Sequence, residues 1–225
     1  MKLKFLTVAF GISFFLMNID AFAQVYRGVN AGAGSTIVRA KSTDSNIEGS
    51  FYLFDDWKPG KVEFSDGSEP QTKDIKFDVV DNLLVVKGDK DTESTFVSPV
   101  SKFFVQENGK WLEFRKGFTG KDLNEGIFIQ VIHSSPKSSF FKKESKTVIE
   151  SKGYNTATVT KKIETTSTYY LQQGSDKQLT LAKRDNKSLI SLLNKPEIDT
   201  FLKANKLNLK RDEDLIKLFT FYDTL

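Results

Sequence analysis

Apolar and polar residues alternate with a period of two along most of the chain, which indicates β-strands. Ile75, Phe77 and Val79 alternate with polar neighbours. The apolar run Leu83–Val86 follows after the polar pair Asp81-Asn82. Two strand-like runs around a two-residue polar turn predict a β-hairpin.

Two further turn signals, Asn108-Gly109 and Gly174, each lie between strand-like runs and predict two more hairpins. Ile127–Ile132 is almost continuously apolar, as expected of a central strand. Residues 24–184 hold about ten to twelve candidate strands in all. Their spacing predicts a mainly β fold, an antiparallel sandwich or open barrel, and not alternating β-α-β units.

The hydrophobic period changes after Arg184 and becomes helical. Helix starts are indicated by Asp185, Asn186 and Ser188 as possible caps, by Pro196 and by the acidic run Asp212–Asp214. Residues 185–225 are therefore predicted to form a C-terminal cluster of about three short α-helices. Such short helices do not persist alone, so we expect this segment to pack on the β-rich domain. The apolar stripe of the last helix consists of Leu215, Leu218, Phe219 and Tyr222.

The first residues of the chain have the pattern of a secretory signal peptide over residues 1–23. Lys2 and Lys4 are basic, Phe5–Met17 is apolar, and Ala21-Phe22-Ala23 supplies small residues for cleavage. We expect the mature chain to be exported to the periplasm or the outside of the cell.

The amino-acid composition excludes several kinds of functional group from the chain. It contains no Cys and one His, and both Met residues lie in the predicted signal peptide. This excludes disulfides, thiol nucleophiles, thiolate metal sites and a cysteine-linked lipid, so the protein is not predicted to be a lipoprotein. No apolar run of about 18 residues follows the signal peptide, so no transmembrane helix is predicted.

Residues 134–168 form a basic region rich in hydroxyl groups. It contains seven Ser, seven Thr, seven Lys and three Glu. One interpretation is a pair of exposed strands whose lysines prevent aggregation. The other is contact with an anionic glycan or a lipid headgroup. The candidate contact residues are Lys142, Lys143, Lys161 and Lys162.

No catalytic set is assembled in the sequence, and no cofactor or metal site is predicted. Asp55 and Asp56 stand beside Trp57, but neighbouring residues of a strand point to opposite faces. Asp56–Gly60 is therefore interpreted as a turn. His133 is followed directly by serines, without a G-x-S-x-G motif, and is interpreted as structural.

Aromatic residues offer an alternative kind of site. Trp57, Trp111 and Tyr169, together with Tyr52 and Tyr170, are candidates for a sugar-binding platform, although aromatic residues in a β-rich protein more often belong to the core. Nucleic acid is not a predicted partner, because acidic and basic residues balance in the C-terminal segment and the chain carries an export signal.

Two segments resemble a known family. The first runs from Gly49 to Gly67 and contains GSFYL, Trp57, Gly60 and FSDG. The second contains Phe201–Leu209 (FLKANKLNL) and Glu213–Leu218 (EDLIKL). Together they are similar to a family of uncharacterised exported proteins of Gram-negative bacteria. The resemblance implies export and the order of strands followed by helices, and it implies no activity or ligand.

Two functions follow as hypotheses. The favoured one is an exported, non-enzymatic, β-rich module of the bacterial cell envelope that binds or scaffolds another envelope component. The alternative is a glycan-binding or glycan-hydrolysing protein that uses Trp and Tyr together with Asp or Glu. Paired carboxyls in a cleft beside an exposed Trp would favour the alternative.

Overall fold

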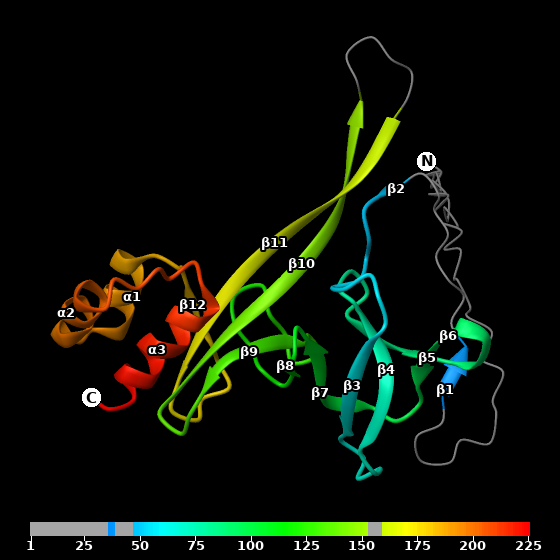
Figure 1. Cartoon of the computed structure of the whole chain (residues 1–225), viewed down its shortest axis with the longest axis horizontal. Coiled ribbons are helices and arrows are strands. Elements are labelled where there is room, and N and C mark those ends of the chain that lie inside the picture. The colour runs from blue at the N-terminus through cyan, green and yellow to red at the C-terminus, as the bar shows by residue number, and fades with distance from the viewer. Residues whose placement is uncertain (1–35, 39–46, 153–158) are drawn as a thin grey trace, which may run out of the picture.

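The chain folds into one large β-sheet with three helices gathered at one end of it (Figure 1). The computed structural model describes residues 36–38, 47–152 and 159–225. The predicted signal peptide, residues 1–23, lies outside the described residues. The strands are β1 (Thr36–Val38), β2 (Ile47–Glu48), β3 (Lys58–Phe64), β4 (Gln71–Asp78), β5 (Leu83–Lys87), β6 (Glu93–Phe96), β7 (Val100–Glu107), β8 (Lys110–Arg115), β9 (Ile129–Ser134), β10 (Ser138–Lys152), β11 (Val159–Gln173) and β12 (Thr180–Ala182). The helices are α1 (Asn186–Leu193), α2 (Pro196–Ala204) and α3 (Asp212–Tyr222).

The described strands join a single sheet in the order β1-β6-β5-β4-β3-β7-β8-β9-β10-β11-β12, with β2 beside β11. Neighbours along this order run antiparallel, whereas β2 runs parallel to β11. The predicted fold class, mainly β with a C-terminal cluster of short helices, is confirmed. The chain is also free of cysteine, as its composition requires.

The predicted hairpins close through residues that tolerate a positive φ. Asn108 and Gly109 have φ angles of 49° and 74°, which suit the two-residue turn between β7 and β8. Asn82 has a φ of 51° in the turn between β4 and β5. Gly174 has a φ of 68° between β11 and β12. Glycine and asparagine adopt this left-handed conformation at low cost, which is why they marked the turns.

The interpretation of Asp56–Gly60 as a turn is wrong, because Lys58, Pro59 and Gly60 open β3. Pro59 pairs with β4 only, since β7 joins β3 from Gly60 onward, so its missing N–H costs no ladder bond. A Cβ atom at Gly60 would lie 2.2 Å from Cδ1 of Ile75. The glycine therefore makes room for a core side chain.

The sheet curls around a cluster of phenylalanines. The rings of Phe77 on β4 and Phe114 on β8 lie 5.8 Å apart, and those of Phe64 on β3 and Phe96 on β6 lie 5.3 Å apart. Each pair is separated by three strand steps, which in a flat sheet would span roughly 14 Å. The strands must therefore coil toward each other, which favours the open-barrel form of the prediction over two stacked sheets.

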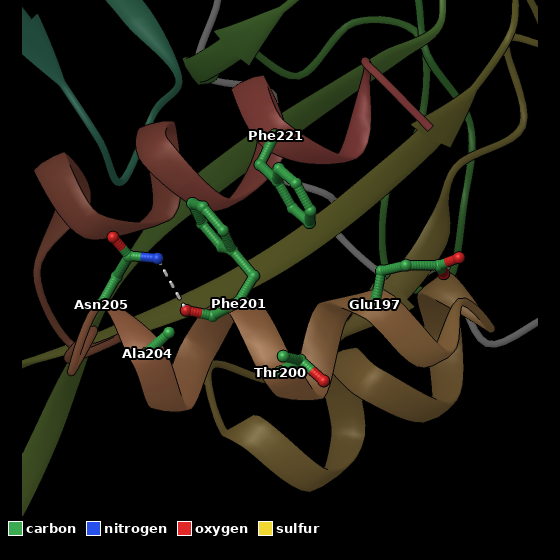
Figure 2. Close-up of a pocket in the computed structure, with 6 residues that line it drawn as sticks. All are labelled: Glu197, Thr200, Phe201, Ala204, Asn205 and Phe221. Atoms are coloured by element: carbon green, nitrogen blue, oxygen red, sulfur yellow. Dashed lines mark hydrogen bonds between the residues drawn. The ribbon is translucent and has the colours of Figure 1, made fainter.

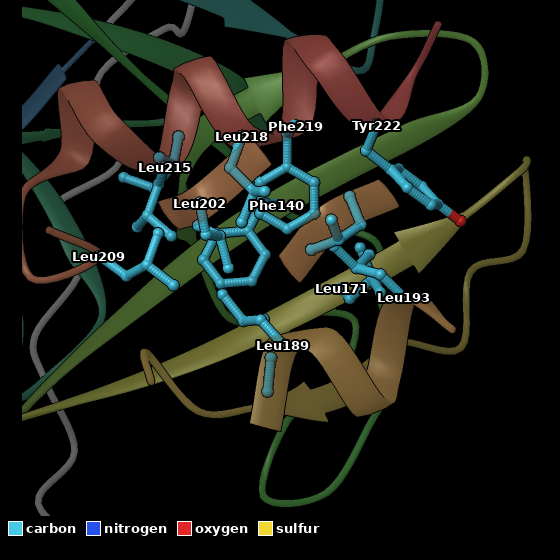
Figure 3. Packing of buried hydrophobic residues seen from close by; sticks show 13 residues of the cluster. Phe140, Leu171, Leu189, Leu193, Leu202, Leu209, Leu215, Leu218, Phe219 and Tyr222 are labelled. Carbon is cyan, nitrogen blue, oxygen red and sulfur yellow. The ribbon is translucent and has the colours of Figure 1, made fainter. Parts of the chain in front are cut away.

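The helices and the sheet share one apolar core, shown in Figure 3. Leu215, Leu218 and Phe219 of α3 are 0% exposed, and Tyr222 is 6% exposed. The ring of Phe219 stacks on Phe140 of β10 at a centroid distance of 4.6 Å. The apolar stripe that was recognised in the sequence of α3 is thus covered by the sheet and by the other helices.

Local contacts fix where the helices begin. Asp185 caps α1, and its Oδ1 accepts the N–H of Ser188 at 2.8 Å. Pro196 occupies the first turn of α2, where its missing N–H is no loss. Asp214, in the first turn of α3, accepts the N–H of Asn208 at 3.0 Å.

Candidate functional site

The β10–β11 hairpin extends beyond the strands that flank it (Figure 1). β9 pairs with β10 only as far as Lys142, and β12 pairs with β11 only from Tyr169 onward. Farther out, β10 and β11 pair with each other, and the two residues of β2 run beside β11. We call residues 143–152 and 159–168 the arm. Strands of this length span roughly 33 Å.

The arm does not take part in the cores of the protein. None of its described side chains belongs to the three buried apolar clusters. Thr147, Glu150, Lys162 and Thr166 are exposed, and Ile149 is 42% exposed. Because successive side chains of a strand alternate, polar groups face solvent on both sides of the arm. The arm is therefore held out as a polar surface.

Two of the predicted contact lysines, Lys142 and Lys143, lie where the arm leaves the sheet. The ammonium group of Lys142 pairs with the carboxylate of Glu144. Lys143 donates from Nζ to the backbone carbonyl of Asp122 at 2.5 Å. Both lysines thus make contacts within the protein.

The other two predicted lysines, Lys161 and Lys162, are adjacent on β11 and therefore point to opposite faces of the arm. Lys161 lies 3.9 Å from the carboxylate of Glu150 on the opposing strand. Lys162 is exposed. The four predicted lysines do not form one basic patch, because they are divided between the base and the outer part of the arm and between its two faces.

Lys146, which the sequence did not single out as a contact residue, ties the arm to the segment before β3. Its Nζ donates to the backbone carbonyl of Ser50 at 2.8 Å and also to that of Tyr52. Partial burial lowers the pKa of Lys146, and the nearby carboxylates of Asp55 and others oppose that shift. Nothing local in the sequence distinguishes this lysine from the others, because its acceptors are carbonyls about a hundred residues away.

The segment 47–53, which we call the strap, crosses the arm close to its surface. Gly49 has a φ of 111°, and a Cβ atom there would lie 3.1 Å from Cβ of Ile163 on β11. The hydroxyl of Tyr52 donates to Glu93 at 2.6 Å. The strap thus connects the outer part of the arm to the curled part of the sheet.

The two tryptophans do not share a platform. Nζ of Lys76 lies 5.0 Å from the ring of Trp57 and 5.0 Å from that of Tyr52. Trp111 is 41% exposed in β8, and Nζ of Lys61 lies 4.4 Å from its ring. Lys61 is four residues from Trp57, roughly 13 Å along an extended chain. Each tryptophan therefore receives its own lysine in a cation–π contact.

Tyr169, the third predicted aromatic residue, lies where the sheet meets the helices. Its hydroxyl accepts a hydrogen bond from Nη1 of Arg184 at 2.8 Å, and the guanidinium lies 4.9 Å from its ring. Arg184 also donates from Nε to the carbonyl of Leu209 at 2.7 Å and pairs with Asp212 at 2.9 Å. Tyr169 is thus part of the joint between β11 and the helices.

His133 of β9 is bound to the end of α3. Its Nε2 lies 2.6 Å from Oδ2 of Asp223, and Ser138 donates to Oδ1 of the same carboxylate at 2.6 Å. Burial raises the pKa of Asp223, but hydrogen bonds from Ser138, Ser135 and His133 outweigh burial, so this pKa lies below its ordinary value. The serine bonds to the carboxylate and not to the imidazole, which is not the order of a catalytic triad.

Three pockets lined by described residues are relevant to the glycan hypothesis. One of ≈ 390 Å³ lies between α2 and α3, where the rings of Phe201 and Phe221 stack at 4.0 Å (Figure 2). A second, of ≈ 650 Å³, lies between β12 and α1. The third, of ≈ 240 Å³, lies at the base of the arm. Each contains at most one carboxylate and no tryptophan, so paired carboxyls beside a sugar-stacking ring are not brought together in them.

In the part of the chain that the structure describes, no three His, Asp or Glu residues are grouped to hold a metal ion. Within the same ranges, no helix has the length and hydrophobicity to cross a bilayer. No family model, no curated protein and no solved structure matches this chain. The resemblance to exported proteins of Gram-negative bacteria stays a prediction.

Proposed function

We propose that this protein is an exported, non-enzymatic module of the bacterial cell envelope, and that the arm binds another envelope component. The structure of the arm supports this proposal, because the arm is long, polar on both faces and separate from the apolar cores. Ordering such a segment costs conformational entropy that burial in a core does not offset, and binding of a partner would offset it.

The choice of the arm over the helices rests on burial. The apolar stripe of α3 is covered, with Leu215 and Leu218 fully buried. The arm instead keeps charged and hydroxyl side chains in solvent, Lys162 and Thr166 among them. A partner that binds the arm would be recognised by polar contacts, as the surface of an envelope protein, an anionic glycan or a lipid headgroup provides.

Site-specific photo-crosslinking tests this proposal. A photoreactive amino acid is placed at Thr166 on the arm or at Thr72, an exposed threonine on β4 that serves as the control. Both variants are exported in Gram-negative cells and irradiated, and the adducts are identified by mass spectrometry. We expect a discrete adduct with another envelope component from Thr166 alone. The same adducts from both positions, or no adduct beyond a second copy of the chain, would contradict the proposal.

A further inference from the structure

The outer edge of β10 within the arm has no partner strand among the described residues. β9 leaves β10 after Lys142, and β11 occupies only the opposite edge. An unpaired edge presents a row of backbone N–H and C=O groups to which another strand can add. A two-stranded ribbon is only marginally stable in water, so the arm would be stabilised by an added strand.

The backbone groups on this edge belong to every second residue of β10. The two-residue turn at Asn108-Gly109 makes Glu107 and Lys110 a hydrogen-bonded pair. Hydrogen-bonded and non-hydrogen-bonded pairs alternate along each antiparallel ladder. Following this alternation from β7 through β8 and β9 to β10 shows that Lys142 and Gln130 are also a hydrogen-bonded pair. The N–H and C=O of Lys142 therefore point toward β9. Beyond the end of β9 the same edge is continued by Glu144, Lys146, Val148 and Glu150.

The side chains along this edge are complementary to themselves when two copies run antiparallel. A two-fold axis at Val148 places Lys146 opposite Glu150 of the partner subunit, and the symmetry repeats this contact on the other side. Opposite charges directly across a strand pair stabilise it, and like charges destabilise it. An axis at Lys146 or at Glu150 would instead place a charge opposite its own copy. The charge pattern therefore selects the register centred on Val148.

Lys146 retains a hydrogen-bond donor for this contact. An ammonium group has three N–H donors, and the carbonyls of Ser50 and Tyr52 accept two of them. The pocket of ≈ 240 Å³ at the base of the arm is lined by Lys143–Lys146 on one side and by apolar residues including Phe77 on the other. This open space adjoins the inner end of the edge, where the partner strand would enter.

We infer that two copies of this protein associate through their β10 edges, with Val148 on the two-fold axis, and form a four-stranded sheet from two arms. The interface is isologous, so one surface supplies both halves. The inference goes beyond the proposed function and does not depend on it. Pairing uses one edge of β10 and leaves the face of the arm that carries Thr166, away from the strap, for another component.

Cysteine crosslinking tests both the association and its register. The chain has no cysteine, so Val148→Cys and Thr147→Cys each introduce a single thiol. Opposite residues of a hydrogen-bonded pair have Cα atoms about 5.5 Å apart, within the range of a disulfide. The two Thr147 positions would be offset by two residues and roughly 8 Å apart, which is too far. On mild oxidation we expect covalent dimer from Val148→Cys and its loss with Thr147→Cys, although Thr147 is the more exposed residue.

A change of charge on the β10 edge distinguishes the loss of strand pairing between two copies from local damage to the arm. Glu150→Lys creates two like-charge contacts, so we expect the two-chain mass seen by sedimentation equilibrium to fall to that of one chain. The control is Glu164→Lys, which makes the same change of charge on β11, opposite Thr147 and away from this edge, so we expect its dimer to persist. A wild-type protein that stays monomeric at all concentrations would overturn the inference, even if its arm binds a different protein. So would equal crosslinking at both positions, or the same loss of dimer from Glu164→Lys.

Discussion

At the scale of single residues, Asp223 is an ionisable group whose charged form is disfavoured by two features of its position. It follows the last turn of α3, where the helix dipole disfavours a carboxylate. Its side chain is 16% exposed, and burial alone would also disfavour its charge. The hydrogen bonds from Ser138 and His133 reverse both effects. Asp223 thus fastens the end of α3 to β9 and β10 through its charged form.

Asp223→Asn should lower the free energy of unfolding by about 1–3 kcal/mol near neutral pH, because hydrogen bonds to a charged acceptor are lost. The pKa of Asp223 is lower in the folded than in the unfolded protein. Its contribution is therefore complete above the unfolded pKa of about 4 and disappears as the pH falls through the folded value. Urea unfolding of both proteins over this range should show the difference in free energy shrinking on acidification.

A matched control for this variant is Asp199→Asn. Asp199 forms an exposed ion pair with Lys203 one turn along α2. Such a pair contributes about 0.5 kcal/mol or less. A difference between wild type and Asp223→Asn that stays constant with pH would contradict the assigned role.

Residue roles could be predicted from the sequence where the interaction partner is a near neighbour. Asp185 was among the predicted caps, because the N–H that its side chain accepts belongs to Ser188, a near neighbour in the sequence. Tyr169 and Lys146 were not assigned their roles, because Arg184 meets Tyr169 only through the sheet–helix joint and the carbonyl of Ser50 meets Lys146 only through the strap. Such contacts depend on pairing distant along the chain, which a single sequence does not encode locally.

At the scale of elements, α3 and the arm have opposite relations to the core. α3 contributes five buried residues, whereas the described side chains of the arm contribute none to the apolar clusters. Removing apolar contacts of α3 should therefore cost stability, and removing the arm should cost function.

Leu218→Ala should lower the free energy of unfolding by about 2–5 kcal/mol, because it leaves a cavity between α3 and the sheet. The control is Ile216→Ala on the same helix, where the side chain is 42% exposed. We expect this control to cost less than about 1 kcal/mol. Chemical denaturation measures both. Equal losses for the two variants would mean that α3 does not dock as described.

Shortening the arm should leave the rest of the fold intact. Replacing residues 146–165 with Asn-Gly joins Ser145 to Thr166, which form a hydrogen-bonded pair suited to a two-residue turn. Because the described side chains among those removed lie outside the cores, we expect the melting temperature to change by only a few degrees. Calorimetry checks this, and crosslinking to other envelope components should be lost. Aggregation or a large fall in melting temperature would show that the arm is needed for folding.

The elements themselves were predicted well wherever a local pattern defines them. The hairpins around Asn82, Asn108 and Gly174 and the three helices were found from alternation, turn residues and caps. The opening of β3 was missed, since Pro59 and Gly60 resemble a turn unless the absence of β7 beside Pro59 is known. The two-residue strand β2 was missed because nothing in so short a segment distinguishes it from a loop.

At the scale of the whole molecule, the curl of the sheet is the property that the sequence predicts least. Spacing of strands left sandwich and open barrel as alternatives. The unbroken pairing of the described strands, together with the contact of Phe77 with Phe114 across three strand positions, favours the open barrel. Phenylalanines in alternating positions fit either architecture, so only the pairing order reveals how far the sheet coils.

The predicted export of the protein has a direct test. If residues 1–23 are a signal peptide, the mature chain should begin at Gln24, because the small residues Ala21 and Ala23 precede this position. Intact-mass and N-terminal peptide analysis of the protein recovered from the periplasm or medium measures the start. Recovery with Met1 or with the apolar segment Phe5–Met17 retained would contradict the prediction.

The pairing of β2 with β11 also affects the order in which parts of the chain fold. Ile47 is made early and pairs with Lys161, which a ribosome or an export channel delivers much later. Contacts between such distant parts of a chain slow folding, because a long loop must close before they form. Until Lys161 arrives, β2 has no strand beside it. The arm should therefore be among the last parts to become ordered, and an incomplete chain would already have begun to build its curled sheet before the arm could form.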